Sequence, residues 1–238
     1  MFTLFPVTKK LQPYISFYYE MKWESKDYDN GIREVILPSG KAFMVFQYEG
    51  MFRGTIYGQE RFVPKYYTIG QQSSNYTVFS DHKTMGLIGA AFKPTGLHKL
   101  FNIDVSTYTN IPTDSTSLFG KDIQPFEVLF EAENEAHKRV ELIENLLLGR
   151  LGNKEFKDNF IDVSNRIIRF NNLFSELDQH NENDYRILSA LFHYYDSSHF
   201  RKDFKKYCGE VPKQFHLDKF EFVKEAFVKN PIFLNSTP

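Results

Sequence analysis

With 238 residues, 42% of them hydrophobic and 25% charged, the chain is long enough for one large or two ordinary globular domains, which argues against bulk disorder and low complexity. The net charge of -1 gives the whole chain no long-range attraction to nucleic acid, and no apolar run reaches the roughly 18 residues of a membrane-spanning helix. Because the N-terminus lacks the order of a signal peptide and the single cysteine, Cys208, excludes an internal disulfide, we expect a cytoplasmic protein with no membrane contact.

Residues 1–125 are predicted to form a β-rich domain. Two strand-like runs within 33–50 are separated by a turn signal at 38–40, and further short aromatic and β-branched runs follow with glycine between them. This texture is typical of a sandwich or a barrel. Five aromatic residues are candidates to line a small-molecule pocket, although aromatic residues in a β domain more often belong to the ordinary core. They are Phe43, Phe46, Tyr48, Tyr57 and Tyr67.

A long amphipathic helix is predicted over 126–151. Ala132, Ala136, Val140, Ile143 and Leu147 recur at three- and four-residue steps and form one stripe, while charged residues fill the other faces. The stripe can pack on the β domain, or part of the helix at 126–150 can form the seam of a homodimer. The sequence leaves both open.

The remainder, 161–238, is predicted to be a small all-α domain that follows a polar linker at 152–160. Helical patterns cover 161–178, 183–195, 197–208 and 215–228. The predicted fold class is therefore α+β, with a β-rich domain, a long linking helix and a helical C-terminal domain.

The helix at 197–208 has two distinct faces. Phe200, Phe204 and Tyr207 share one face, while a serine and cations occupy the other. Asp196 or Ser197 can cap its N-terminus, and the glycine at 209 suits its C-terminus. With the preceding helix it forms a predicted helix-turn-helix over 183–208, in which the second helix is held from behind while polar and cationic side chains point outward.

This segment resembles the second helix-turn-helix of the AraC/XylS family of bacterial transcription regulators. The family pattern combines a Tyr-x-Asp-x-Ser-His-Phe turn, a phenylalanine-spaced recognition helix and Gly-x-x-Pro. The residues that match in order are Tyr194, Asp196, Ser198, His199, Phe200, Phe204, Lys205, Gly209, Pro212 and Phe215. Residues 165–174 resemble the family's linker helix, with Arg169 and Phe170 as its Arg-Phe pair. Upstream, Phe92, Pro94 and Gly96 resemble a segment of the sensor domain in a subgroup of these regulators.

The resemblance implies a cupin-like sensor domain for a small-molecule effector and a C-terminal domain that binds double-stranded DNA. Arg201 and Lys202 are predicted to contact base edges, and Lys205 and Lys206 to contact phosphates. The complete DNA-facing set is Ser197, Ser198, Arg201, Lys202, Lys205 and Lys206.

The chain departs from the family in two ways. Only about ten residues separate the long helix from the linker helix, so the family's first helix-turn-helix has no room, and His193 stands where the family turn has glycine. Residues 151–238 carry 13 Lys/Arg and 13 Asp/Glu, so this part has no net positive charge. Both features favour the alternative of a degenerate sensing or protein-interaction protein that does not bind DNA.

Enzymatic chemistry is not indicated. There is no nucleophile elbow, phosphate-binding loop or dinucleotide fingerprint, so no catalytic residue is assigned. The seven histidines are scattered, with only His82 in the β region, so we expect neither a metal site nor a cofactor.

Overall fold

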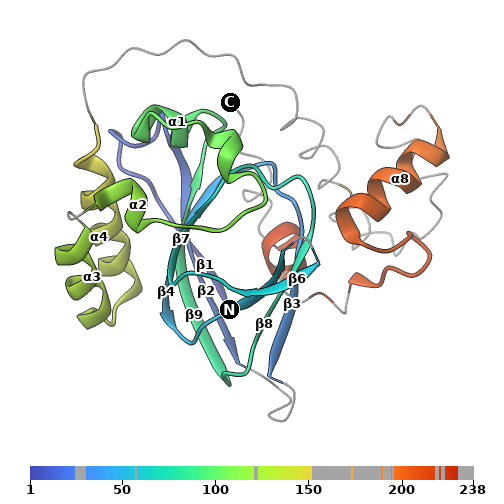
Figure 1. Cartoon of the computed structure of the whole chain (residues 1–238), viewed down its shortest axis with the longest axis horizontal. Coiled ribbons are helices and arrows are strands. Elements are labelled where there is room, and N and C mark those ends of the chain that lie inside the picture. Colours follow the sequence, from blue (N-terminus) through green and yellow to red (C-terminus); the bar gives the residue numbers. More distant parts are fainter. Residues whose placement is uncertain are drawn as a thin grey trace.

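The computed structural model describes residues 1–24, 31–56, 58–120, 123–151, 196–217 and 223–229, together with Leu173, Ser189, Tyr194 and Phe220. In Figure 1 a two-sheet β domain lies at the centre, with α3 (Ile123–Ala132) and α4 (Ala136–Leu148) on one side and α8 (Ser197–Cys208) on the other. The predicted α+β class is confirmed for these residues. None of their helices is long and apolar enough to cross a membrane.

The larger sheet has six antiparallel strands in the order β1-β2-β9-β4-β7-β10. They are β1 (Phe2–Phe5), β2 (Ile15–Glu24), β4 (Phe43–Glu49), β7 (Tyr66–Ile69), β9 (Thr84–Phe92) and β10 (Thr113–Asp114). The smaller sheet has the order β3-β8-β5-β6 and is also antiparallel. Its strands are β3 (Ile32–Ile36), β5 (Arg53–Ile56), β6 (Gln59–Phe62) and β8 (Tyr76–Ser80).

The turn predicted at 38–40 is confirmed. It connects β3, which belongs to the smaller sheet, to β4 in the larger one. Gly40 has a φ of 71°, a left-handed conformation that costs little only for glycine. The chain can therefore cross between the sheets at this point.

The two faces of the larger sheet contact different apolar clusters. One face packs against the smaller sheet and buries side chains such as Phe17, Val45 and Leu87. The other face lies under the helices and buries Phe46 together with Phe130 of α3. Since successive strand residues point to opposite faces, β4 and β9 are apolar over most of their length, whereas β2 alternates, with Ser16, Glu20, Lys22 and Glu24 between its apolar residues.

Four helices follow the strands along this second face: α1 (Gly96–Phe101), α2 (Thr116–Phe119), α3 and α4. A 3₁₀ turn, η1 (Val105–Tyr108), lies between α1 and α2.

The single long helix predicted over 126–151 is wrong. The helix is interrupted at 133–135, where the backbone of Glu135 is extended. The Glu133 carboxylate accepts hydrogen bonds there from the backbone N–H groups of Asn134 and Glu135. Two shorter helices can fold back so that both apolar faces reach the sheet, which one straight helix cannot do. Val140, Ile143 and Leu147 of the predicted stripe are buried, whereas Ala132 is exposed.

Helix α8 begins and ends as predicted. The partner helices predicted over 161–178 and 183–195, with Arg169, Phe170 and His193, lie outside the described residues except for isolated positions. Of the helix predicted over 215–228, the described part contains a π-helical turn, η4 (Lys224–Val228). Residues 215 and 216 are not helical, and the Phe215 ring stacks on that of Phe220 at 4.9 Å between ring centres.

Candidate functional site

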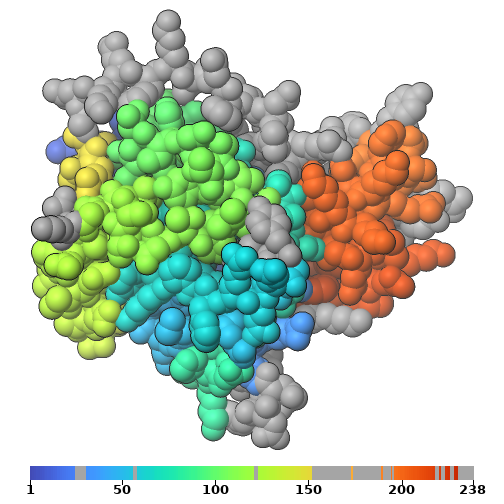
Figure 2. Space-filling view, in the orientation of Figure 1, coloured from blue at the N-terminus to red at the C-terminus, as the bar shows by residue number. Residues whose placement is uncertain are grey.

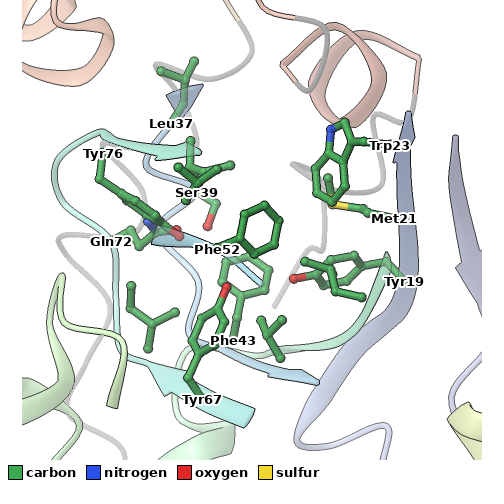
Figure 3. A pocket seen from close by; sticks show the side chains of 15 residues that line it. Tyr19, Met21, Trp23, Leu37, Ser39, Phe43, Phe52, Tyr67, Gln72 and Tyr76 are labelled. Atoms are coloured by element: carbon green, nitrogen blue, oxygen red, sulfur yellow. The ribbon is translucent and has the colours of Figure 1, made fainter. Parts of the chain in front are cut away.

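An apolar pocket opens between the two sheets, lined by fifteen residues (Figure 3). Six of them are aromatic: Tyr19, Trp23, Phe43, Phe52, Tyr67 and Tyr76. Seven are aliphatic or methionine: Met21, Ile36, Leu37, Val45, Ile69, Val78 and Leu87. Ser39 and Gln72 complete the lining, so no charged side chain takes part.

Strand periodicity selects which aromatic residues reach the pocket. Every second residue of β2, at Tyr19, Met21 and Trp23, faces it. Tyr19 lies across β9 at Gly89, where an added Cβ would come within 2.3 Å of the tyrosine ring. Only glycine leaves room for the ring at that position.

The pocket candidates predicted from the sequence divide between the two faces. Phe43 and Tyr67 line the pocket. Phe46 belongs to the opposite cluster, and Tyr48 lies beside Arg139 of α4, so neither lines the pocket. The candidates divide in this way because Phe43 and Phe46, three residues apart on β4, must point to opposite faces of the sheet. Tyr57 lies outside the described residues.

The polar groups of the pocket converge on its middle. In Figure 3 the hydroxyl groups of Tyr19, Tyr67 and Tyr76 are directed there from three strands. Burial raises the pKa of Tyr76 to about 12, with a partial offset from hydrogen bonding to Tyr67. Burial also holds the pKa values of Tyr19 and Tyr67 well above the ordinary tyrosine range. All three are therefore neutral phenols near pH 7 and can donate hydrogen bonds.

Gln72 adds an amide to this polar group. Its side chain is 2% exposed and lies against Tyr76, an interaction that also moderates the pKa of that tyrosine. By distance and angle, however, the Nε2 atom completes no hydrogen bond within the described part of the chain. Because a buried amide N–H without an acceptor is costly, this atom is a ready donor for a bound molecule.

The pocket encloses about 50 Å³ of free volume. A dry cavity of roughly 150 Å³ holds a benzene molecule in an engineered protein core. In this conformation the pocket therefore suits a slender ligand, or one that displaces a side chain. Trp23, which is only half-buried, contacts Phe52 edge-to-face at 5.6 Å.

Lys41, a buried lysine, follows the pocket residue Ser39 by two positions in the chain. The backbone N–H of Lys41 donates to Ser39 Oγ at 3.2 Å, and burial lowers the pKa of its ammonium group to about 8. Its side chain is not part of the lining. Sequence reasoning missed both Gln72 and Lys41, because neither residue belongs to a recognisable motif.

The other face of the sheet holds a buried polar clamp made of Arg139, Tyr48 and Glu20. The Arg139 guanidinium lies 3.8 Å from the centre of the Tyr48 ring, and the Tyr48 hydroxyl donates to Glu20 Oε1 at 2.6 Å. Arg139 and Glu20 are only 6% and 4% exposed. A cation stacked on a ring whose hydroxyl meets a carboxylate fixes α4 to β2 and β4.

Replacing Arg139 by leucine is expected to lower the free energy of unfolding by about 2 kcal/mol, because it removes a desolvated cation from the face of the Tyr48 ring, while Glu20 keeps Lys22 as its ion-pair partner at 3.5 Å. Urea denaturation followed by circular dichroism measures this. Lys138→Leu, one residue earlier on the exposed side of α4, is the matched control and should leave the unfolding midpoint unchanged. Equal midpoints for the two variants would contradict a clamp.

Helix α8 carries the predicted DNA-facing residues. The Asp196 carboxylate accepts from the N–H groups of Ser198 and His199 at 2.7 and 2.9 Å, and these bonds lower its pKa. Gly209 ends the helix with a φ of 83°. Of the two N-cap residues considered, Asp196 performs the role.

The two faces of α8 separate as the helical wheel predicts. Phe200, Phe204, Tyr207 and Cys208 are buried. Ser198, Arg201, Lys202, Lys205 and Lys206 are exposed, and Ser197 is half-buried. In Figure 2 this helix forms a lobe beside the β domain.

One loop, 70–76, connects the two candidate regions. It supplies Gln72 to the pocket and leads into Tyr76 at the start of β8, while a Cβ added to Gly209 would lie 2.9 Å from Asn75 Nδ2 in the same segment. Asn110 holds the loop from another side by accepting the Ser73 N–H at 2.8 Å. The aromatic residues of α8 also belong to the same apolar cluster as the sheet interface.

Comparisons with known proteins give a family for the β domain only. A family described as a domain of unknown function, DUF6597, matches residues 4–114, which run from β1 to β10 and make up less than half of the chain. No curated protein matches the sequence.

Several solved structures are distantly similar. A cupin domain of an XRE-family transcriptional regulator from Enterobacter cloacae is 12% identical, covers 40% of this chain and 96% of its own, and has a TM-score of 0.31. An apo lysine variant of ToxT from Vibrio cholerae is 8% identical over 83% of this chain and 96% of its own, with a TM-score of 0.40. Wild-type ToxT with a bound unsaturated fatty acid is 11% identical over 82% and 93%, with a TM-score of 0.34. Scores this low assign no ligand or activity to the present chain.

Proposed function

We propose that this protein is a transcription regulator resembling the AraC family, in which α8 binds the major groove of DNA and the pocket between the sheets binds a small-molecule effector. The observation that carries the proposal is the face of α8: an exposed row of serine, arginine and lysine side chains on a helix that is capped at both ends and anchored by buried aromatic rings. Recognition by a helix-turn-helix requires this combination.

The effector role is supported by the loop 70–76. Two of its residues, Gln72 and Tyr76, line the pocket, and its Asn75 side chain lies against the end of α8. A ligand that moves Gln72 or Tyr76 can therefore alter how α8 is held. A contact of this kind is what an effector needs to bind with different affinity to two arrangements of the protein.

Dimerisation belongs to the same proposal. One helix-turn-helix makes few phosphate contacts, and two copies on one duplex would restore affinity by presenting two recognition helices to successive half-sites. The exposed apolar residues of α3, Val128 and Leu129, at 71% and 56% exposure, lie within the segment predicted as a dimer seam.

DNA binding by the purified protein tests the proposal. Fluorescence anisotropy with pooled random and promoter-derived duplexes, at about 50 and 200 mM salt, should show binding that weakens steeply as salt rises, because phosphate contacts release counterions. Binding that survives competitor DNA would identify a specific duplex.

The alternative is a sensing or interaction protein derived from the same family that no longer binds DNA. The balance of 13 cationic and 13 acidic residues over 151–238 favours it, because nonspecific DNA affinity depends on net positive charge near the duplex. A folded protein that shows no binding to any duplex at low salt would establish this alternative.

A further inference from the structure

The pocket has properties that define the chemistry of its ligand. None of its fifteen lining residues is charged, and the three tyrosines that face it are neutral. A carboxylate or an ammonium group placed there would lose its water without gaining an opposite charge. The lining therefore selects against ionised ligands.

Its polar groups converge on one place and include one that can only donate. Gln72 Nε2 is buried and lacks a hydrogen-bond partner within the described residues, and the hydroxyl groups of Tyr19, Tyr67 and Tyr76 point to the same region in Figure 3. An amide N–H can only donate, so the ligand atom that completes it must be an acceptor. The opposite end, at Met21, Phe52 and Trp23, offers only apolar and aromatic surface apart from the indole N–H.

We propose that the pocket binds a neutral, slender, mainly apolar molecule whose carbonyl oxygen accepts a hydrogen bond from Gln72 Nε2 and whose hydrocarbon tail lies against Trp23. This inference rests on the proposed role of the pocket as an effector site. The free volume of about 50 Å³ is smaller than such a molecule, so binding requires a lining side chain to move, and Trp23 is half-buried.

Trp23 makes the test direct. It is the single tryptophan of the chain and part of the lining, so tryptophan fluorescence comes from the pocket and responds to its occupancy. Three probes with eight-carbon skeletons separate the possibilities: methyl hexyl ketone, the corresponding secondary alcohol, and octanoate. We expect the ketone to change the Trp23 emission saturably and to bind at least tenfold more tightly than octanoate, with the alcohol in between.

The variant Gln72→Leu removes the donor while keeping an apolar side chain, so the fold should be retained. It is expected to weaken ketone binding roughly five- to tenfold, the effect of losing one hydrogen bond in a buried site. Gln71→Leu, the adjacent residue outside the lining, is the matched control and should leave ketone affinity unchanged. Thermal melts of both variants separate a binding defect from unfolding, and Gln72→Met repeats the test if the leucine variant is unstable.

Three results would overturn this ligand class. The first is octanoate binding as tight as that of the ketone. Loss of octanoate binding in Lys41→Met would then identify the buried lysine as its counter-ion. Unchanged ketone affinity in Gln72→Leu would remove the donor from the site. No response to any probe would exclude the pocket for such molecules.

The proposed function fails separately from the ligand class. Ketone binding that leaves DNA affinity unchanged in the anisotropy assay would retain the ligand class and refute the effector role. DNA binding without any response of Trp23 to the probes would refute the ligand class and retain the proposed DNA-binding role of α8.

Discussion

Replacing both Arg201 and Lys202 by alanine is expected to reduce the affinity for a specific duplex to the nonspecific level while leaving the protein folded. Both side chains are exposed on α8, so their removal opens no cavity. A side chain that reads a base edge contributes about 1–3 kcal/mol of discrimination, and two together account for a fall of roughly two to four powers of ten. Anisotropy at fixed salt, with and without competitor DNA, measures the change.

Two further double variants separate the contribution of base contacts to binding from that of positive charge. Lys205→Ala with Lys206→Ala removes the predicted phosphate-binding cations and should weaken binding to all sequences alike, with the salt slope reduced by about 0.9 for each phosphate that is no longer neutralised. Lys9→Ala with Lys10→Ala removes the same charge from an exposed site near the N-terminus and should change little. If the Arg201/Lys202 variant keeps its affinity and specificity, α8 is not the reading helix.

The substitution Phe46→Ala is expected to lower the free energy of unfolding by about 3–5 kcal/mol. Phe46 is fully buried, and its ring lies between 5.1 and 5.6 Å, centre to centre, from those of Tyr66, Phe126 and Phe130. Truncation removes one ring from the centre of this cluster and leaves a cavity beneath α3. Urea denaturation of the wild type and the variant gives the difference.

Two companion variants make the result specific. Phe46→Leu preserves most of the volume and should cost clearly less than the alanine variant. Phe62→Ala makes the same change at a ring that is 73% exposed and should stay within about 0.5 kcal/mol of the wild type. A similar cost at positions 46 and 62 would show that the aromatic cluster does not hold the helices on the sheet.

Helix α8 and strand β4 show what the residue pattern alone can and cannot predict. On α8 the positions of Phe200, Phe204 and Tyr207 alone predicted which face is buried, because a single helix has one period and its caps are local. In β4 the same kind of reasoning grouped Phe43 with Phe46 as pocket candidates. The strand period of two places these two residues on opposite faces of the sheet.

The break between α3 and α4 shows a second limit. The stripe at 140, 143 and 147 was correctly predicted to be buried, yet the apolar spacing continued upstream through Ala136 and Ala132 and concealed the end of a helix. Glutamate side chains that bond nearby backbone N–H groups compete with the helix at 133–135. Packing of both halves on the same sheet then favours the bent arrangement.

The sequence by itself determined the α+β class, the β-rich N-terminal part, the turn at Gly40, and the bounds, caps and two faces of α8, since each depends on residues close together in the chain. The tertiary structure decided which side chains meet in the pocket and in the Arg139 clamp. Gln72, Tyr19 and Tyr67 come from separate elements, and Arg139 reaches Tyr48 across 91 positions of sequence. Contacts of that kind depend on strand order and sheet packing, and local periodicity contains no information about either.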